Sequence, residues 1–368
     1  MHVGTSVIFQ NPHDQRSDRE VYQNDLRLAR LADPLGFDSI WGVEHHFTDY
    51  TMCPDVLQFL TYMAGCSQRL QLGSMVVVLP WHDPLRVAEQ VAMLDHLSNG
   101  RMIFGMGRGL GRIEFEGFRV PMDESRGRFV ESAQMIIAGL ENGYCQFDGE
   151  YVHQPRKDIR PRPFRSFKGR TYAAAVSPES VRIMAELGVG ILIIPQKPWE
   201  TVAEELRQYR EVYREVNRED PPPTIAAGWT FCHEDENVAR RMAVEYINGY
   251  WETVIRHYEF KGDHFGKTKG YEYYGRMADM VSKYGSEGVS DFFLNLQVWG
   301  TPQQCLDKIL DIRARVGCDT FVGVFSYAGM PHDAAEASMR LFAREVMPEL
   351  KSLALLQPGA APAEAHPG

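Results

Sequence analysis

The stretch "SMVVVLP", residues 74–80, is apolar at nearly every position and is rich in β-branched side chains. A strand with one face in water alternates apolar and polar residues, whereas a continuous apolar run is typical of a parallel strand buried on both faces. Parallel strands of this kind occur almost only in α/β proteins, where helices cover the sheet. The run therefore predicts a parallel α/β fold.

On either side of this run, short apolar segments alternate with longer segments whose apolar residues recur at the i, i+3, i+4 spacing of amphipathic helices. The predicted strands are Val3–Phe9, Ser39–Val43, Leu70–Leu79, Met102–Met106, Thr171–Val176, Ile191–Ile194, Thr224–Phe231 and Thr320–Phe325. The predicted helices are Asp18–Leu35, Pro54–Gln68, Leu85–Leu97, Glu124–Leu140, Pro178–Leu187, Thr201–Val216 and Glu236–Val254. Eight strands that alternate with helices predict a (β/α)8 TIM barrel of the α/β class.

A doubly wound open sheet is the alternative α/β architecture. Its dinucleotide-binding form carries a glycine fingerprint in the turn after the first strand. The segment "GMGRGLG", residues 105–111, has the glycines, but it lies at the end of the fourth predicted strand and the first strand lacks the expected turn. The barrel is therefore the preferred prediction.

Two segments exceed ordinary loop length. In Tyr144–Arg170 the sequence "FDGEYV" predicts a small hairpin turn. The other segment, Tyr258–Val289, precedes the last predicted strand and is rich in Gly, Lys, His and Tyr. Its composition indicates that it buries little apolar area, so we expect a mobile insertion that acts as a lid, with an inert surface excursion as the alternative.

Composition restricts the partners and the compartment. The 368 residues include 39 basic and 49 acidic side chains, and the net charge of -10 argues against a nucleic-acid partner or an anionic membrane. Six cysteines lie far apart without a CxxC pair, which indicates a reducing cytoplasm rather than a disulfide scaffold or a zinc knuckle. No leader sequence and no apolar run of 18 residues is recognisable. We expect one barrel domain over residues 1–352 and a disordered tail, rich in Pro, Ala and Gly, over residues 353–368.

Polar residues follow several predicted strands, and in TIM-barrel enzymes the active site lies at the carboxyl ends of the strands. Residues 44–46, "EHH", place three titratable side chains after the second strand. Arg108, after the fourth strand, offers a fork of N–H donors for a phosphate, and its glycine neighbours let a flat ligand approach the backbone. Ser177, Pro178 and Ser180 form a predicted helix start, where free backbone N–H groups attract anions. The polar residues at these strand ends together predict one polar site at the carboxyl end of the barrel.

No metal site is predicted from the two adjacent histidines. Neighbouring residues on a strand point to opposite faces, so His45 and His46 do not easily hold one ion, and the HxH spacing of metal-dependent barrel hydrolases is absent. We therefore expect a structural role for His46.

Six segments carry a more specific signal. They are "GFDSIWGVEHHFTDY" (36–50), "LDHLSNGRMIFGMGRGLGRIEFEGF" (94–118), "MDESR" (122–126), "KTKGYEYYG" (267–275), "VWGTPQQCLDKI" (298–309) and "LFAREVMPELK" (341–351). In order and spacing they resemble the bacterial luciferase-like, flavin-dependent monooxygenases, and specifically the luciferase alpha subunit. The likeness covers about residues 1–351.

The resemblance implies an activity and its partners. Proteins of this family are TIM barrels that bind reduced FMN, capture dioxygen as a flavin C4a-hydroperoxide and pass one oxygen atom to an organic substrate. The reduced flavin comes from a separate NAD(P)H-dependent reductase, so no pyridine-nucleotide site is needed. We accordingly expect a small organic, apolar substrate, dioxygen as co-substrate and a homodimer.

The resemblance also assigns roles position by position. His45 matches the active-site histidine that assists proton transfer, and Glu44 matches the carboxylate beside it. Arg108 matches the arginine that binds the FMN phosphate. The other matches are Leu110, a backbone contact to that phosphate; Ser177 and Ser180, which hold the same phosphate; Glu114, an acidic residue near the flavin; and Met75 and Val76, under the isoalloxazine ring.

The sequence departs from luciferase at two of these positions. Gly107 stands where luciferase has a reactive cysteine beside the flavin, and Val176 stands where it has a glutamate before the phosphate-binding serine. The missing cysteine favours a dark monooxygenase over a light-emitting enzyme. Two other functions stay open: a deazaflavin-dependent oxidoreductase of the same superfamily, and a non-catalytic flavin-binding subunit like the luciferase beta chain. Retention of His45, Arg108 and "KTKGY" favours a catalytic chain.

The substrate pocket has only weak candidates in the sequence. Six aromatic residues are candidates for lining an apolar cavity, with ordinary core positions as the alternative: Trp81, Phe115, Phe118, Trp229, Trp251 and Trp299.

Overall fold

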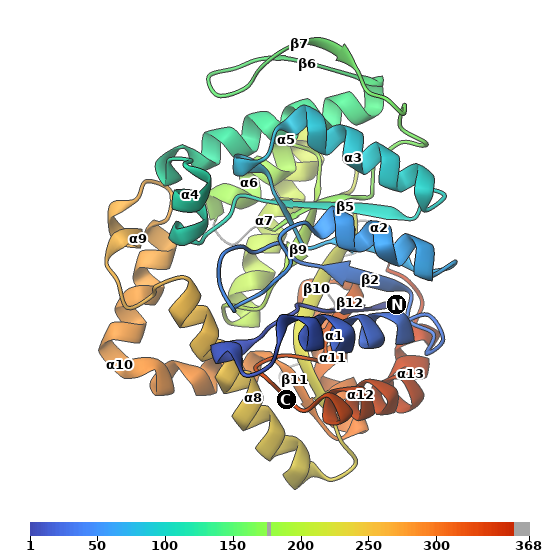
Figure 1. Cartoon of the computed structure of the whole chain (residues 1–368), viewed down its shortest axis with the longest axis vertical. Helices are drawn as coiled ribbons and strands as arrows, with labels where there is room; N and C mark the ends of the chain where they lie inside the picture. Colours follow the sequence, from blue (N-terminus) through green and yellow to red (C-terminus); the bar gives the residue numbers. More distant parts are fainter. Residues whose placement is uncertain (175–177, 357–368) are drawn as a thin grey trace.

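Eight parallel strands close into a barrel in the computed structural model, which describes residues 1–174 and 178–356 (Figure 1). The barrel strands are β1 (His2–Ser6), β2 (Ser39–Gly42), β3 (Gln71–Ser74), β5 (Met102–Gly107), β8 (Thr171–Ala174), β9 (Gly190–Ile193), β10 (Thr224–Cys232) and β12 (Cys318–Val324). Each strand pairs with the next in this order, and β12 pairs with β1. The predicted TIM barrel is confirmed.

Helices surround the barrel, as the periodicity predicts. They are α1 (Asp18–Leu31), α2 (Val56–Cys66), α3 (Pro84–Leu97), α4 (Arg112–Phe118), α5 (Ser125–Asn142), α6 (Pro178–Glu186), α7 (Trp199–Asn217), α8 (Glu236–His257), α11 (Pro302–Val316), α12 (His332–Leu341) and α13 (Met347–Ser352). Polar caps fix several of their starts, because a side-chain oxygen accepts a free backbone N–H of the first turn. Ser17, Asp55, Asp83, Asp235 and Thr301 cap α1, α2, α3, α8 and α11 in this way.

The third predicted strand, Leu70–Leu79, is wrong as a single strand. It is divided into β3 and the short β4 (Val77–Val78), and a 3-10 turn (Leu79–Trp81) follows. At the end of β3, Ser74 Oγ donates to the carbonyl oxygen of Gly105 and accepts from its N–H, both at 2.8 Å. Since this side chain replaces backbone pairing, the ladder to β5 stops there. Met75 and Val76, joined by a cis peptide bond, lie in the interruption.

A hairpin forms in the first long segment, where the sequence predicts one. β6 (Tyr144–Asp148) and β7 (His153–Asp158) pair antiparallel and lie outside the barrel against α5, at the top of Figure 1. The Glu131 carboxylate of α5 accepts the backbone N–H groups of Glu150, Tyr151 and Val152, each at 2.8 Å. One carboxylate therefore fixes the turn.

The insertion before the last strand is confirmed, but the expectation that it buries little apolar area is wrong. It contains α9 (His264–Lys267) and most of α10 (Glu272–Leu296), and β11 (Val298–Gly300), which follows it, pairs with β10. Phe260, Phe265 and Tyr271 are almost fully buried. Each aromatic side chain covers a large apolar area, so these few rings outweigh the many glycines and lysines of the segment. Mobility of the segment stays a prediction.

The two ends of the described chain lie together. The Met1 ammonium group donates to the carbonyl oxygens of Leu350 and Leu353, both at 2.8 Å, and the Leu356 N–H donates to Asp319. The predicted tail therefore begins with residues that contact the barrel, and its remainder, 357–368, lies outside the described residues. Among the helices that are described, none has the length and apolar character needed to cross a membrane.

Candidate functional site

One cavity lies at the carboxyl ends of the strands and collects residues from five of them. The lining residues are Glu44 and His45 after β2, Met75 and Val76 after β3, residues 107–110 at the end of β5, Ala174 of β8, and Ile194 and Gln196 after β9. The insertion contributes Tyr258, Gly270, Tyr273 and Tyr274. Of the predicted site residues, Glu44, His45, Met75, Val76, Gly107, Arg108, Leu110, Glu114 and Ser180 line this cavity. The predicted contacts Val176 and Ser177 lie outside the described residues.

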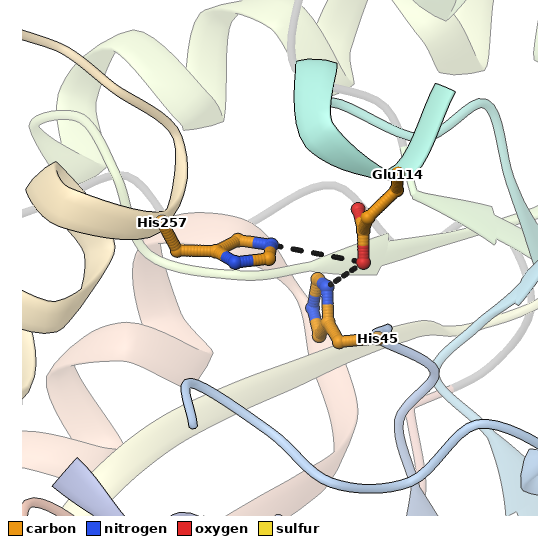
Figure 2. A group of neighbouring side chains, drawn as sticks. All are labelled: His45, Glu114 and His257. Atoms are coloured by element: carbon orange, nitrogen blue, oxygen red, sulfur yellow. Dashed lines mark hydrogen bonds and ion pairs between the residues drawn. The ribbon is translucent and has the colours of Figure 1, made fainter. Parts of the chain in front are cut away.

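His45 is bound to Glu114 rather than to its sequence neighbour Glu44. Its Nδ1 lies 3.0 Å from Glu114 Oε1 (Figure 2). The His46 backbone N–H donates to the same oxygen at 2.9 Å. A carboxylate only accepts, so the His45 proton in this pair is on Nδ1. In the neutral ring Nε2 then carries the lone pair, and it lies 3.5 Å from the Tyr258 hydroxyl. His45 can therefore accept a proton from a group in the cavity.

Glu114 is buried and yet stays ionised. Burial by itself raises the pKa of this carboxyl, but the imidazoles of His45 and His257 more than compensate and hold its pKa below the ordinary range. A carboxylate on Nδ1 orients the ring and stabilises the imidazolium that forms when Nε2 takes up a proton. The pair is thus arranged for general acid–base chemistry.

Glu44 belongs to a second hydrogen-bonded group. Its carboxylate accepts the Val78 N–H at 3.0 Å and Trp81 Nε1–H at 2.7 Å, and it contacts His82 Nε2 at 2.8 Å and His46 Nε2 at 3.1 Å. Burial opposes its ionisation, but the hydrogen bonds from His46 and His82 lower the pKa of Glu44 overall. The group fixes the end of β2 to the segment after β4, and His46 has the structural contacts expected of it.

Arg108 lies where the insertion meets the barrel. Its Nη1 donates to the carbonyl oxygen of Gly270 at 2.8 Å, and its guanidinium lies 4.0 Å from the ring centre of Tyr271. Arg126 Nη2 donates to the same carbonyl at 3.3 Å. The Tyr271 hydroxyl donates to the carbonyl oxygen of Gly109 at 3.0 Å and lies 2.9 Å from Ser125 Oγ. Two cations therefore converge at one edge of the cavity, under the turn that precedes α10.

The lining residues fit a flat ring system that carries a phosphate. A Cβ on Gly107 would come within 2.4 Å of Val76, and Gly109 has a φ of +82°, which favours glycine. Arg108 and Arg126 supply charged donors for an anion. Gln196 Oε1 also lines the cavity and is buried without a hydrogen-bond partner within the described chain, so it is available to an N–H of a ligand. These groups fit a flavin-type cofactor that carries a phosphate.

Sequence reasoning missed His257, the last residue of α8. Its Nε2 lies 3.6 Å from Glu114 Oε1, the oxygen that His45 also contacts (Figure 2). The ligand atoms of His45, Glu114 and His257 lie within 4.8 Å of one another, a spacing that would also suit a metal ion. The argument against a metal considered only His45 and His46. Because more than 140 residues separate His257 from Glu114, no local motif could have indicated it.

The six aromatic candidates for the substrate pocket do not line this cavity. Trp81, for example, packs against Phe115 and Phe118, and Trp229 packs against Tyr250. Their alternative assignment, as ordinary packing residues, fits these contacts. The aromatic lining comes instead from Phe129, Tyr258, Tyr273 and Tyr274, three of which belong to the insertion.

Comparison with known proteins agrees with this geometry. Residues 1–320 match the family model of the luciferase-like monooxygenases. The chain belongs to this family. It is 28% identical over 360 residues to the alkanal monooxygenase alpha chain of Photorhabdus laumondii, covering 95% of this chain and 98% of that one. The resemblance deduced from the motifs is confirmed, and the chain is a flavin-dependent monooxygenase.

Solved structures support the fold. The monooxygenase RslO1 from Streptomyces bottropensis has a TM-score of 0.75 at 25% identity, covering 95% of this chain and 99% of that one. The oxygenating constituent of 3,6-diketocamphane monooxygenase from Pseudomonas putida, solved with FMN, gives 0.69 at 18% identity, with coverages of 95% and 99%. The coenzyme F420-dependent tetrahydromethanopterin reductase from Methanopyrus kandleri gives 0.63 at 18%, with 95% and 100%. The fold therefore occurs with flavins and with a deazaflavin.

Proposed function

We propose that this flavin-dependent monooxygenase uses reduced FMN, supplied by a separate NAD(P)H-dependent flavin reductase, to insert one oxygen atom of O2 into an apolar organic substrate. The observation that carries the proposal is the His45–Glu114 pair, which faces the same cavity as Arg108. One end of this cavity offers a proton acceptor and the other a phosphate site. Reduced FMN would supply the electrons that activate dioxygen.

Several residues would hold the cofactor. Arg108, with Arg126 beside it, binds the phosphate through charge-assisted hydrogen bonds. Ser180 lines the cavity in the first turn of α6, a helix end that favours anions, and Ser177 is assigned to the same phosphate by the family resemblance. The ring system rests on Met75 and Val76. The backbones at Gly107 and Leu110 complete the contacts, because the missing side chain at position 107 leaves room there.

The chemistry at the other end belongs to His45. Its Nε2 takes a proton from the reacting group and returns it later, while Glu114 stabilises the charged ring. Glu44, with its carboxylate held by Val78, Trp81 and His82, fixes the end of β2 from which His45 projects.

The substrate side of the cavity is apolar. Phe129, Ile183, Met184, Leu192 and Ile194 are among the residues that line the cavity, and we propose that such side chains favour an apolar organic molecule. We further propose a homodimer, because Tyr62 of α2 and Met93 and Leu97 of α3 are exposed on neighbouring helices. Light scattering of the purified protein tests the dimer.

A deazaflavin-dependent oxidoreductase is the second candidate, since the fold also occurs with F420. The two are distinguished by supplying the enzyme with reduced FMN or reduced F420 and a panel of apolar aldehydes and ketones under 18O2. We expect product that carries one 18O atom with reduced FMN alone. Oxygen-independent turnover with F420 would contradict the proposal. Binding of FMN without any oxygenated product over the panel would favour the third candidate, a non-catalytic subunit.

A further inference from the structure

The Glu114 carboxylate lies between two imidazoles, and the proposed function uses only one of them. We propose that His257 is a positioning residue, which shares the Glu114 carboxylate with His45 and thereby fixes the tautomer and the basicity of His45. The proposal rests on the proposed function, because it concerns the same proton transfer. His257 itself does not line the cavity, so it acts through Glu114.

The His257 ring is held on its face and at Nδ1, and its Nε2 faces Glu114. Its side chain is 1% exposed and stacks on Tyr50, with ring centres 4.5 Å apart and an interplanar angle of 16°. The Nδ1 atom lies 2.8 Å from Thr48 Oγ1, and Nε2 lies 3.6 Å from Glu114 Oε1. The ring thus bridges Thr48, which is partly exposed, and Glu114, which is buried.

The hydrogen bonds around Thr48 determine which nitrogen atom of His257 carries the proton. The Tyr50 backbone N–H donates to Thr48 Oγ1 at 3.4 Å, so the Thr48 hydroxyl hydrogen is available to His257 Nδ1. The His257 proton is then on Nε2, which has no hydrogen-bond partner within the described residues and lies 3.6 Å from Glu114 Oε1. A buried N–H without an acceptor is costly, and the negative charge of the nearby carboxylate offsets part of that cost. Burial lowers the pKa of His257, which keeps the ring neutral.

Two N–H groups therefore donate to one carboxylate oxygen, Nδ1 of His45 and the backbone N–H of His46, and Nε2 of His257 lies 3.6 Å from the same oxygen. Each draws on the same negative charge. Because the N–H of His257 partly neutralises the negative charge of Glu114, the carboxylate attracts a proton on His45 less strongly. Removing the His257 N–H should therefore strengthen the His45–Glu114 bond and make His45 hold a proton to higher pH.

The other titratable groups near Thr48, His257, Glu114 and His45 do not exchange protons with these residues at neutral pH. Burial raises the pKa of Tyr50 to about 12 and raises the pKa values of Tyr250 and Tyr258 well above the ordinary value. Two acids on the outer side are held by arginines, in the pairs Asp49–Arg256 and Glu259–Arg112. The remaining neighbours are His46, which is bound to Glu44, and His264, whose pKa is lowered by burial.

Two variants of His257 separate the proposed role from packing. His257→Leu removes the N–H, whereas His257→Gln can present an N–H close to the position of Nε2. The probe is the 1H–15N spectrum of the apoprotein labelled with 15N-histidine, in which His45→Gln identifies the His45 signal. We expect the Nδ1–H tautomer for His45, a downfield move of its proton signal in the Leu variant, and a return toward the parent position in the Gln variant. An unmoved signal in the Leu variant, with the fold intact by circular dichroism, would overturn the proposal.

The reaction supplies a second readout. In His257→Leu the acid limb of the pH–rate profile should move to higher pH by about 0.5 pH unit, roughly threefold in proton affinity, with FMN affinity unchanged. His257→Gln should restore the parent profile, and equal profiles in all three proteins would contradict the role. If the parent lacks flavin-dependent oxygenation, the proposed function fails while the spectrum still tests His257. A Zn²⁺-dependent rise in Tm that both His257 variants abolish would identify the cluster as a metal site and overturn the proposal.

Discussion

The Arg108 guanidinium lies over the ring of Tyr271, 4.0 Å from its centre, and donates to the neighbouring Gly270 carbonyl. The residue proposed to hold the cofactor phosphate is therefore also the residue that fastens the insertion to the barrel. A phosphate that accepts hydrogen bonds from Arg108 weakens the contact between Arg108 and the insertion. By linkage, the position of the insertion changes the affinity of the protein for the phosphate.

Arg108→Ala should weaken FMN much more than riboflavin, which has no phosphate. A charge-assisted hydrogen bond contributes about 1.5–3 kcal/mol, or roughly a 10- to 150-fold loss of FMN affinity. Fluorescence titration of the two flavins measures this, and Arg128→Ala, which removes a surface partner of Glu124, is the matched control. Equal losses for FMN and riboflavin would place Arg108 outside the phosphate site.

The insertion around Gly270 should be a preferred site of limited proteolysis, and FMN should slow cleavage more than riboflavin. Tyr271→Phe removes the hydroxyl contacts to Gly109 and Ser125 without removing the ring, so cleavage in the absence of flavin should become faster. The same variant should divert oxygen use toward hydrogen peroxide, because a looser lid admits water. Unchanged coupling and cleavage in Tyr271→Phe would show that these contacts do not close a lid.

His45→Ala should bind FMN nearly as well as the parent and should form product about 10²–10⁴-fold more slowly, the usual loss for a positioned proton-transfer group. The control is His96→Ala, far from the cavity on α3, which should keep the parent rate. Turnover of His45→Ala within about threefold of the parent would exclude this histidine as the acid–base group.

Arg170→Met should destabilise the fold without altering the site. Arg170 and Asp95 form two hydrogen bonds of 2.6 Å, and the Asp95 side chain is fully buried, so the variant leaves a buried charge without its partner. We expect a loss of about 3–5 kcal/mol in chemical denaturation, against less than about 0.5 kcal/mol for the exposed control Arg182→Met. Activity per folded molecule should persist, because the pair lies at the amino ends of β5 and β8, away from the cavity.

Glu44→Gln should lose stability in a pH-dependent manner. The folded pKa of Glu44 lies below its ordinary value of 4.5, so its contribution is present above that value and disappears as the pH falls through the folded pKa. The pKa of His82 is raised above 6.5, so the stability that protonated His82 contributes to the fold is present below pH 6.5 and is lost as the pH rises through the folded pKa. We expect Tm of the parent to exceed that of Glu44→Gln near pH 6 and the difference to narrow toward pH 3. A constant difference would contradict this linkage, and the exposed Glu116→Gln serves as control.

The sequence predicts the barrel and much of its cavity, because buried parallel strands and helix stripes are local patterns. It also predicts the residue types at the strand ends, including His45 and Arg108. It does not predict the break after Ser74, which depends on a hydroxyl that meets Gly105 across the sheet. Nor does it indicate the partners of the two carboxylates. Glu44 contacts His46 in the irregular segment that follows β2, whereas Glu114 and His257 reach His45 only through the tertiary fold.

The pairing of β1 with β12 has a consequence for how the chain is made. His2 lies beside Thr320 in this ladder, and the Thr5 hydroxyl donates to the Gly323 carbonyl oxygen. During synthesis the first strand therefore waits for the last one, and until then one edge of β1 has unpaired N–H and C=O groups. Open strand edges are templates for association with other chains, and contacts between distant residues form slowly. The unfinished polypeptide is thus most vulnerable to aggregation just before its final strand emerges, and protection by a chaperone matters most at that stage.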